Sequence, residues 1–520
     1  MSTIDIQLIQ PTTSTIYIGY DSINDYNYWR EDGSTNEIIL NISYLYVIIN
    51  NNSSSGSLLT VNFETSLQFD NSSYFIIGSD YITVNGGSKD GYTVNIYSVG
   101  TNYNGLFQNS LELPISNSNT TLNNPTNNNI YGVFNYITIE NINLTTDGLV
   151  TINDYQGWIA QAYFGYGGTN NNINNCSSTG SISGYASGGI IGSAALATAT
   201  NCNSTGDITG ENAGGIFGSS PISETDINCN GTVAEKQYSY AIGCYSTGII
   251  SGNNSGGIFG SIDFYNDYPT LGYAVDCYST GLIETNGGGI FGAYSNGIAT
   301  KCYSTGILIG VGSGGILGEY SSGSASGCWS TGDILGVYNG GIIGRQSSGT
   351  VYNCYSTGII NGVDSGGITG PYSTTIISNC YSTGNIVSDN CGGITSPFNY
   401  GPVTNCYSRG IISGAGCGGI YGAYCSTGIA KNCYSSGIIS GVGAGGIFGV
   451  FDPDVLWTAK LINCYYANGV WGSSSSYTNI ELAIKDDNTT ENELSNLEIY
   501  VDGVQIWDTS NIPYTLVSNP

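Results

Sequence analysis

Fifteen cysteines are the side chains in this chain best suited to chemistry, and eleven of them recur at a nearly constant spacing. From Cys277 onward the gaps are 25, 26, 26, 26, 26, 27 and 31 residues. Thiols repeated in this way could bind a metal, form disulfides or pack in an interior. The eleven positions are Cys176, Cys202, Cys244, Cys277, Cys302, Cys328, Cys354, Cys380, Cys406, Cys433 and Cys464.

The packing role fits these cysteines best. Zinc sites take paired ligands, and the chain has no histidine and no Cys-x-x-Cys. A disulfide between neighbouring repeats is awkward because parallel Cβ vectors do not meet the required torsion, whereas free cysteine is among the most buried residue types. We therefore predict no metal and no other cofactor, a second short column at Cys391 and Cys417, and a main column of buried thiols at Cys302, Cys328, Cys354, Cys380, Cys406 and Cys433.

The spacing of these cysteines also predicts the fold. A fixed period of this size indicates a solenoid, in which each repeat buries its apolar face against its neighbours. In "KCYSTGILIGVGSGGILGEYSSGSAS", which starts at Lys301, the apolar runs are two to four residues long and are separated by Gly and Ser. No run approaches the length of a helix. The sequence predicts an all-β, right-handed parallel β-helix with about 26 residues per coil.

A Gly-Gly-Ile motif in each repeat predicts the core. The glycine pairs, for example Gly340-Gly341 and Gly366-Gly367, are typical of a corner or of a close backbone approach. The isoleucine that follows each pair is expected to stack inward, one rung per coil, about 4.8 Å apart. This ladder is predicted at Ile316, Ile342, Ile368 and Ile447.

The Asn-Cys-Tyr motif predicts a second corner. A turn at the asparagine points the cysteine inward and the next residue outward. Loss of the Cys354 thiol to serine is then predicted to destabilise the fold, because a buried hydroxyl would be poorly satisfied. The outward residues are expected to form an aromatic stack at Tyr303, Trp329, Tyr355, Tyr381, Tyr407 and Tyr434.

Acidic residues do not form a recognisable catalytic pattern. Glycoside hydrolases need two carboxylates at a defined separation, and lyases need a base such as Lys or Arg. The three arginines, at 30, 345 and 409, are far apart in the sequence. We predict no catalytic residue and no enzymatic activity, and we expect the carboxylates to lie on a solvated surface, among them Asp207, Asp333, Asp364 and Asp389.

Composition excludes several classes of partner. Of the 520 residues only 9% are charged, and 37 acidic against 9 basic residues give a net charge of −28, which disfavours binding to nucleic acid. The first residues, "MSTIDIQLIQPTTSTIYIGY", lack the basic and apolar regions of a signal peptide, and no apolar run approaches a membrane span. We expect synthesis in the cytoplasm without a signal peptide and no membrane insertion.

The repeat divides the chain into three parts. Residues 1–71 lack it and alternate apolar with polar positions, which predicts an N-terminal β cap. Residues 72–470 are assigned to the β-helix, with insertions at about 219–243 and 261–275. Residues 471–520 carry eight acidic residues and one lysine. They are predicted to form a C-terminal cap that protects the last coil, with a hairpin in "NLEIYVDGVQIWDTS".

The motif "GGIxGxxxxxxxxNCYSTGxIxG" resembles the GLUG repeats of bacterial surface adhesins and some surface proteases. Together with "YQGWIAQAYFGYGGTNNNINNCSSTGSISG", it is also similar to repeat proteins encoded by amoeba-infecting giant viruses. The resemblance covers roughly residues 72–470 and implies a β-solenoid without assigned catalytic residues.

That resemblance implies a structural or surface protein of a giant-virus particle, in a surface layer or fibril, that acts in assembly or host attachment. Self-association into a homo-oligomer or array is expected, because a neutral polar surface has few charges to desolvate, and other virion proteins or glycans are further expected partners. Two alternatives stay open at this point. One is a carbohydrate-active enzyme on a β-helix scaffold, since fold alone does not decide function, and the other is a glycan-binding adhesin.

Overall fold

The computed structural model describes residues 6–40, 46–51, 56–70, 74–87, 92–97, 102–108, 134–165, 168–219, 238–261, 272–450, 459–462 and 464–467, and five short strands after them. Within this part of the chain there are strands, bridges and turns but no helix, and so none that could cross a membrane. Contacts divide the chain into two compact units, Met1–Cys277 and Tyr278–Pro520.

The first unit begins with a mixture of antiparallel and parallel strands. Strand β2 (Thr15–Asp21) pairs antiparallel with β3 (Tyr26–Glu31), which continues to β4 (Ile38–Leu40). Strand β2 also pairs in parallel with β6 (Leu59–Phe63), in which every second residue is buried. The antiparallel strands lie within the predicted cap. Parallel stacking, however, already starts before residue 72. Strands with alternating burial, such as β6, can bury one face in the interior and so belong to the stacked coils.

Three sets of parallel strands then build the coils of the first unit. One set continues from β6 through β9 (Ile82–Asn85), β13 (Ile137–Glu140), β16 (Asn172–Asn174), β18 (Thr198–Thr200), β20 (Ser239–Ile242) and β22 (Gly272–Val275). The second runs through β7 (Leu67–Asp70), β10 (Thr93–Tyr97), β14 (Asn143–Thr146), β17 (Ser177–Ser178), β19 (Asn203–Ser204) and β21 (Tyr245–Ser246). The third comprises β1 (Ile6–Ile9), β5 (Tyr46–Ile49), β8 (Tyr74–Ile77) and β12 (Phe107–Gln108), with a separate pair β11 (Asn102–Tyr103) and β15 (Thr151–Ile152).

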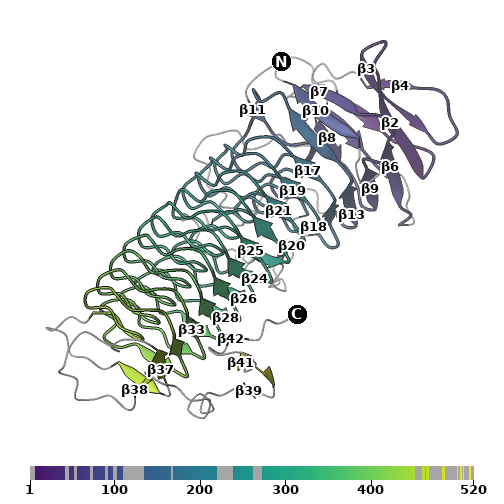
Figure 1. Ribbon diagram of the computed structural model, residues 1–520. Helices are drawn as coiled ribbons and strands as arrows, with labels where there is room; N and C mark the ends of the chain where they lie inside the picture. Colours follow the sequence, from purple (N-terminus) through teal and green to yellow (C-terminus); the bar gives the residue numbers. More distant parts are fainter. Residues whose placement is uncertain are drawn as a thin grey trace, which may run out of the picture. The chain divides into compact units, whose positions relative to one another are not determined.

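The second unit repeats a simpler coil, and Figure 1 shows its coils in green, one after another. Each coil has one strand of two or three residues, a turn, and a two-residue strand, and each strand pairs in parallel with its counterpart about 26 residues away. The longer strands are β24 (Ile298–Thr300), β26 (Ser324–Ser326), β28 (Thr350–Tyr352), β30 (Ile376–Ser378), β32 (Val403–Thr404), β34 (Ile429–Lys431) and β36 (Lys460–Ile462). The shorter are β23 (Tyr278–Ser279), β25 (Tyr303–Ser304), β27 (Trp329–Ser330), β29 (Tyr355–Ser356), β31 (Tyr381–Ser382), β33 (Tyr407–Ser408) and β35 (Tyr434–Ser435).

The predicted parallel β-helix is therefore confirmed, and its hand stays a prediction. Beyond the regular coils, β37 (Cys464–Ala467) pairs in parallel with β38 (Ala483–Asp486). The predicted hairpin is present as β39 (Tyr500–Val501) and β40 (Val504–Gln505), and β41 (Trp507–Asp508) pairs antiparallel with β42 (Thr515–Leu516). Most of the predicted insertions, at 220–237 and 262–271, and most of residues 471–520 lie outside the described residues.

Corners in each coil are made by residues in the left-handed backbone region. Asn353 has φ +54°, as predicted for the Asn-Cys step, and Gln346 and Asp364 have φ +55° and +57°. Asparagine, and to a lesser degree aspartate, adopts this conformation more readily than most non-glycine residues. Each corner residue is followed by a small inward side chain, which is Ser347, Cys354 or Ser365 in this coil.

The glycine pairs serve a different purpose, which is close approach of neighbouring coils. A Cβ atom on Gly341 would meet the carbonyl oxygen of Gly367 far inside contact distance, and it would lie 2.7 Å from Ser356 Oγ. Only a residue without a side chain fits between these two backbones. The isoleucines after the pairs, Ile316, Ile342, Ile368 and Ile447, are all fully buried, and backbone hydrogen bonds join Ile316 to Ile342 and Ile342 to Ile368.

Candidate functional site

The cysteine column lies in the interior, one thiol per coil. Cys302, Cys328, Cys354, Cys380, Cys406 and Cys433 are all completely buried. The Cys354 Sγ accepts a hydrogen bond from the backbone N–H of Cys328 at 3.3 Å and donates to the carbonyl oxygens of Ala325, at 3.4 Å, and Tyr352, at 3.2 Å. The thiols of Cys354, Cys380 and Cys406 each accept a hydrogen bond from the backbone N–H of the cysteine one coil earlier, and so pair a buried backbone group.

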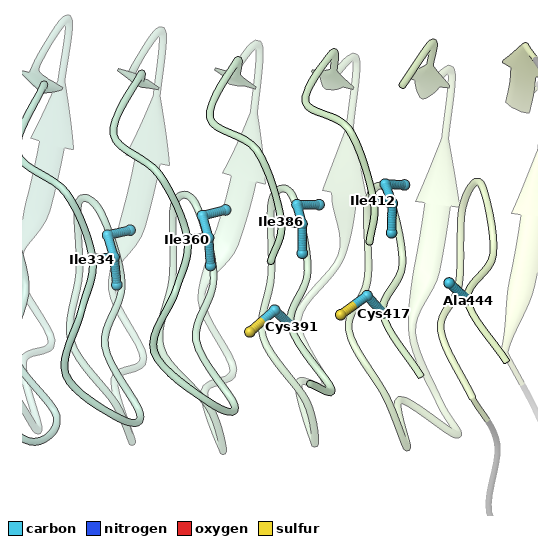
Figure 2. Close-up of a cluster of buried hydrophobic side chains, with 7 residues drawn as sticks. All are labelled: Ile334, Ile360, Ile386, Cys391, Ile412, Cys417 and Ala444. Atoms are coloured by element: carbon cyan, nitrogen blue, oxygen red, sulfur yellow. The ribbon is translucent and has the colours of Figure 1, made fainter. Parts of the chain in front are cut away.

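Hydroxyls have the same role at the other two corners. Ser347 Oγ accepts from the N–H of Ser321 at 3.1 Å, and Ser365 Oγ accepts from the N–H of Asn339 at 3.1 Å. Cys391 and Cys417 continue the Ser365 column, and their Sγ atoms donate to the carbonyls of Gly362 and Ser388, at 3.0 and 2.9 Å. Figure 2 shows these two thiols beside the inward isoleucines of their coils. Sulfur and oxygen thus occupy the same position in the Ser365 column.

Burial opposes ionisation of these thiols, although at Cys328 the hydrogen bonds with Cys302 and Cys354 outweigh desolvation and lower the pKa. Desolvation raises the pKa of Cys354 and of Cys380 well above the ordinary value and raises the pKa of Cys425 to about 12. Nucleophilic attack and metal binding both require the thiolate. Fourteen cysteines are free and buried, and Cys229 lies outside the described residues. Within the part of the chain described here, no three His, Cys, Asp or Glu residues are grouped as a metal site would need.

We expect Cys354→Ser to retain more stability than Cys354→Ala, which revises the expectation of a poorly satisfied hydroxyl. Serine keeps an acceptor for the Cys328 N–H, as the hydroxyls of Ser347 and Ser365 accept from backbone N–H groups at their corners. Alanine leaves that N–H unpaired, at a cost of about 1–3 kcal/mol. Guanidinium unfolding of both variants and the parent chain measures the order. If alanine proves the milder change, the thiol acts by packing alone.

Outside the cysteine column stands the aromatic stack, defined as Tyr278, Tyr303, Trp329, Tyr355 and Tyr381. Because side chains alternate along a strand, the residue after each buried cysteine points outward. Neighbouring rings are nearly parallel, with interplanar angles of 4–9° and centroids 4.8 Å apart, or 5.9 Å between Trp329 and Tyr355. The faces of these rings cover one another, so edges and hydroxyl groups are what the stack presents outward.

The last two predicted members of the stack are not open to solvent. Tyr407 continues the stack 4.9 Å from Tyr381, and Tyr434 pairs in register with Tyr407. Their exposed fractions, however, are only 2% and 3%. A ring on the outer side of a strand reaches such values only where other parts of the chain cover it. The prediction of an outward stack therefore needs correction at Tyr407 and Tyr434.

Three of the aspartates predicted to lie on the surface are bonded to backbone. Asp207 Oδ1 accepts from the N–H of Ile249 at 2.9 Å, and Asp333 Oδ1 accepts from that of Ile359 at 2.8 Å. Asp389 Oδ1 accepts from Ala415 N–H at 2.9 Å. Desolvation raises the pKa of Asp364 above its ordinary value. These carboxylates thus join successive coils in addition to carrying surface charge.

The ion pairs Arg30–Glu64 and Glu319–Arg345 were not anticipated from the sequence, and the second lies within the regular coils. The Glu319 carboxylate is bonded to the guanidinium group of Arg345, and the exposed fractions of the two side chains are 3% and 30%. Burial raises the pKa of Glu319, while Arg345 and Asn286 act in the opposite direction. The two residues are 26 positions apart and so occupy the same place in successive coils. A search of the sequence for oppositely charged residues separated by one repeat would have found this pair.

Comparison with known proteins adds little to this description. No protein-family model and no curated protein matches the chain. A solved structure from Bacteroides ovatus, provisionally named an immunoglobulin A1 protease, is 14% identical, and the match covers 91% of this chain and 95% of that chain with a TM-score of 0.16. A likeness at this level carries no functional argument.

Proposed function

We propose that this chain is a non-enzymatic structural or surface protein. The observation that carries the proposal is the aromatic stack, in which one kind of surface is repeated from coil to coil at 4.8–5.9 Å. A surface of this kind offers the same contacts along its length, which suits assembly or attachment over an extended area. An active site requires instead a local group of unlike side chains held in one geometry.

The interior supports the same proposal. Cysteine thiols, the most nucleophilic groups of the chain, lie at corners of the coil, and burial raises the pKa of Cys354 and Cys380. The aspartates Asp207, Asp333 and Asp389 tie one coil to the next. The polar groups that sequence analysis singled out as chemically capable therefore have structural partners. Residence in a giant-virus particle, as part of a surface layer or fibril, is proposed on the repeat resemblance alone.

Attachment to glycans through the aromatic stack is the less favoured form of this function. Sugars stack on the open faces of aromatic rings, and from Tyr303 to Tyr381 those faces are turned to neighbouring rings. Contacts to the ring edges and to tyrosine hydroxyls fit a protein partner better, because tyrosine at interfaces combines an apolar ring with a hydrogen-bonding group.

Two measurements test the proposal. Mass spectrometry of purified virus particles and of infected-cell cytosol is expected to find the protein enriched in the particles. Incubation of the purified full chain with a panel of polysaccharides is expected to release neither reducing nor unsaturated sugars. Release of such sugars would establish the enzyme alternative, and confinement of the protein to the cytosol would contradict a particle component.

A further inference from the structure

A second outward surface of the Tyr278–Pro520 unit is unusually apolar. It flanks the inward column of Leu308, Ile334, Ile360, Ile386, Ile412 and Ile439, whose members bridge from coil to coil. Residues on either side of an inward strand position point outward. Figure 2 shows four of these isoleucines, Ile334, Ile360, Ile386 and Ile412, at the same place in successive coils.

Three columns make up this surface, which we call the aliphatic face. The first column, one position before the inward residue, contains Ile307, Ile359, Ile411 and Ile438, with exposed fractions of 39–60%. The second, one position after it, contains Ile309, Leu335 and Val387, each 43% exposed. The third, three positions after it, contains Val311, Val363 and Val442, with exposed fractions of 41–85%.

Three polar residues within the aliphatic face are already bonded inside it. Asp333 and Asn385 stand in the first column, where their Oδ1 atoms accept from the N–H groups of Ile359 and Ile411, at 2.8 and 3.0 Å. Asp389, in the third column, accepts from the next coil in the same way. The face contains no lysine or arginine. Covering it therefore removes mainly apolar surface and few unsatisfied polar groups from water.

We infer that a second copy of this chain covers the aliphatic face through the same face. The ten side chains expose on the order of 800 Å², about the area that each partner buries in an interface of standard size. A second copy also has the same spacing between coils, so that its columns stay in step with these columns over every coil. A partner with another repeat distance would lose that register within a few rungs.

A two-fold arrangement also accommodates the negative charge of the face. Asp333 and Asp389 lie in different coils and different columns. A two-fold axis places a residue against its own copy only where that residue lies on the axis, so apolar partners are available to both. The net charge of −28 opposes association of two copies. Added salt screens this repulsion and is therefore expected to strengthen the association.

This inference rests on the proposed function, and sedimentation equilibrium of the full chain tests it separately. The parent chain is expected to be dimeric or larger at micromolar concentration. The triple variant Leu335→Asn/Ile359→Asn/Ile411→Asn is expected to raise the dissociation constant by at least about 100-fold. Asparagine is chosen because Asn361 and Asn385 already occupy these columns, so the coils accept it.

The matched control is Ile376→Asn/Ile429→Asn, which changes exposed isoleucines of β30 and β34 on another side of the coil, 53% and 39% exposed. It is expected to associate like the parent chain. Thermal unfolding of each variant establishes that it is folded, and if the triple variant is not, the single variant Ile359→Asn with a smaller expected loss replaces it. A monomeric parent chain, or equal loss in control and test variants, would overturn the inference. Both of these results differ from the release of sugars from polysaccharides, which is the outcome that would overturn the proposed function.

Discussion

Replacing Gly341 by alanine is expected to lower the free energy of unfolding by about 3 kcal/mol or more, the upper end of the usual cost of overpacking. The added Cβ would strike the carbonyl oxygen of Gly367 in the next coil and would lie 2.7 Å from Ser356 Oγ. Neither obstacle moves easily, because one is backbone and the other is a short side chain of the interior. Guanidinium or thermal unfolding of the full chain measures the loss.

Gly327→Asn is the matched control for this prediction. Gly327 lies at the corner before Cys328, with φ +62°, and the nearest neighbour of an added Cβ is the Lys301 Cγ at 3.7 Å. The corresponding corner of the next coil carries Asn353, with φ +54°. Asparagine fits this conformation, so stability should be unchanged or slightly raised. A Gly341→Ala variant as stable as the Gly327→Asn variant would show that the coils do not meet closely at the glycine pairs.

Replacing Arg345 by methionine is expected to cost about 3–5 kcal/mol at neutral pH, the usual effect of removing one partner of a buried ion pair. Glu319 has a side chain only 3% exposed, and its pKa is already raised by burial. Without Arg345 the carboxylate loses the partner that favours its charged form, so its pKa rises further. Methionine keeps much of the length of the arginine side chain, which separates loss of charge from loss of packing.

The pH dependence of the Arg345→Met variant identifies the cause. Because the pKa of Glu319 is higher in the folded than in the unfolded chain, folding favours the protonated form. That contribution is fully present below the unfolded pKa, near 4.5, and is lost as the pH rises through the folded pKa. The difference between variant and parent is therefore expected to be largest at neutral pH and to shrink toward pH 4. The double variant Glu319→Gln/Arg345→Met, which has no buried carboxylate, should not show this dependence.

If unfolding measurements gave the same loss for Arg345→Met at pH 4 and pH 7, the effect would come from packing of the arginine stem on Gly312. A Cβ on Gly312 would lie 3.0 Å from Arg345 Cγ, so this contact is close. The double variant distinguishes the two causes at neutral pH, since it recovers stability only when the buried charge is responsible.

The amino-acid sequence by itself determined the repeat and much of its cross-section. Its period of about 26 residues and its short apolar runs predicted parallel coils, and Ile342 and Cys354 are buried as the motif implied. The corner at Asn353 was also predictable, because asparagine is one of the few non-glycine residues that enter the left-handed region readily. Such features recur in coil after coil, so the repetition of one short motif makes them recognisable in the sequence.

Tertiary structure decided what depends on contacts between coils. The Cys354 thiol accepts from Cys328, one coil earlier, and only this geometry shows that serine could replace it. The burial of Tyr407 and Tyr434 was likewise not evident from the repeat, and Glu319 pairs with a residue of the next coil, Arg345. A periodic pattern specifies which residues face inward, but burial, hydrogen bonding and charge pairing depend on the distance between atoms of different coils, and that distance is set only when the coils stack.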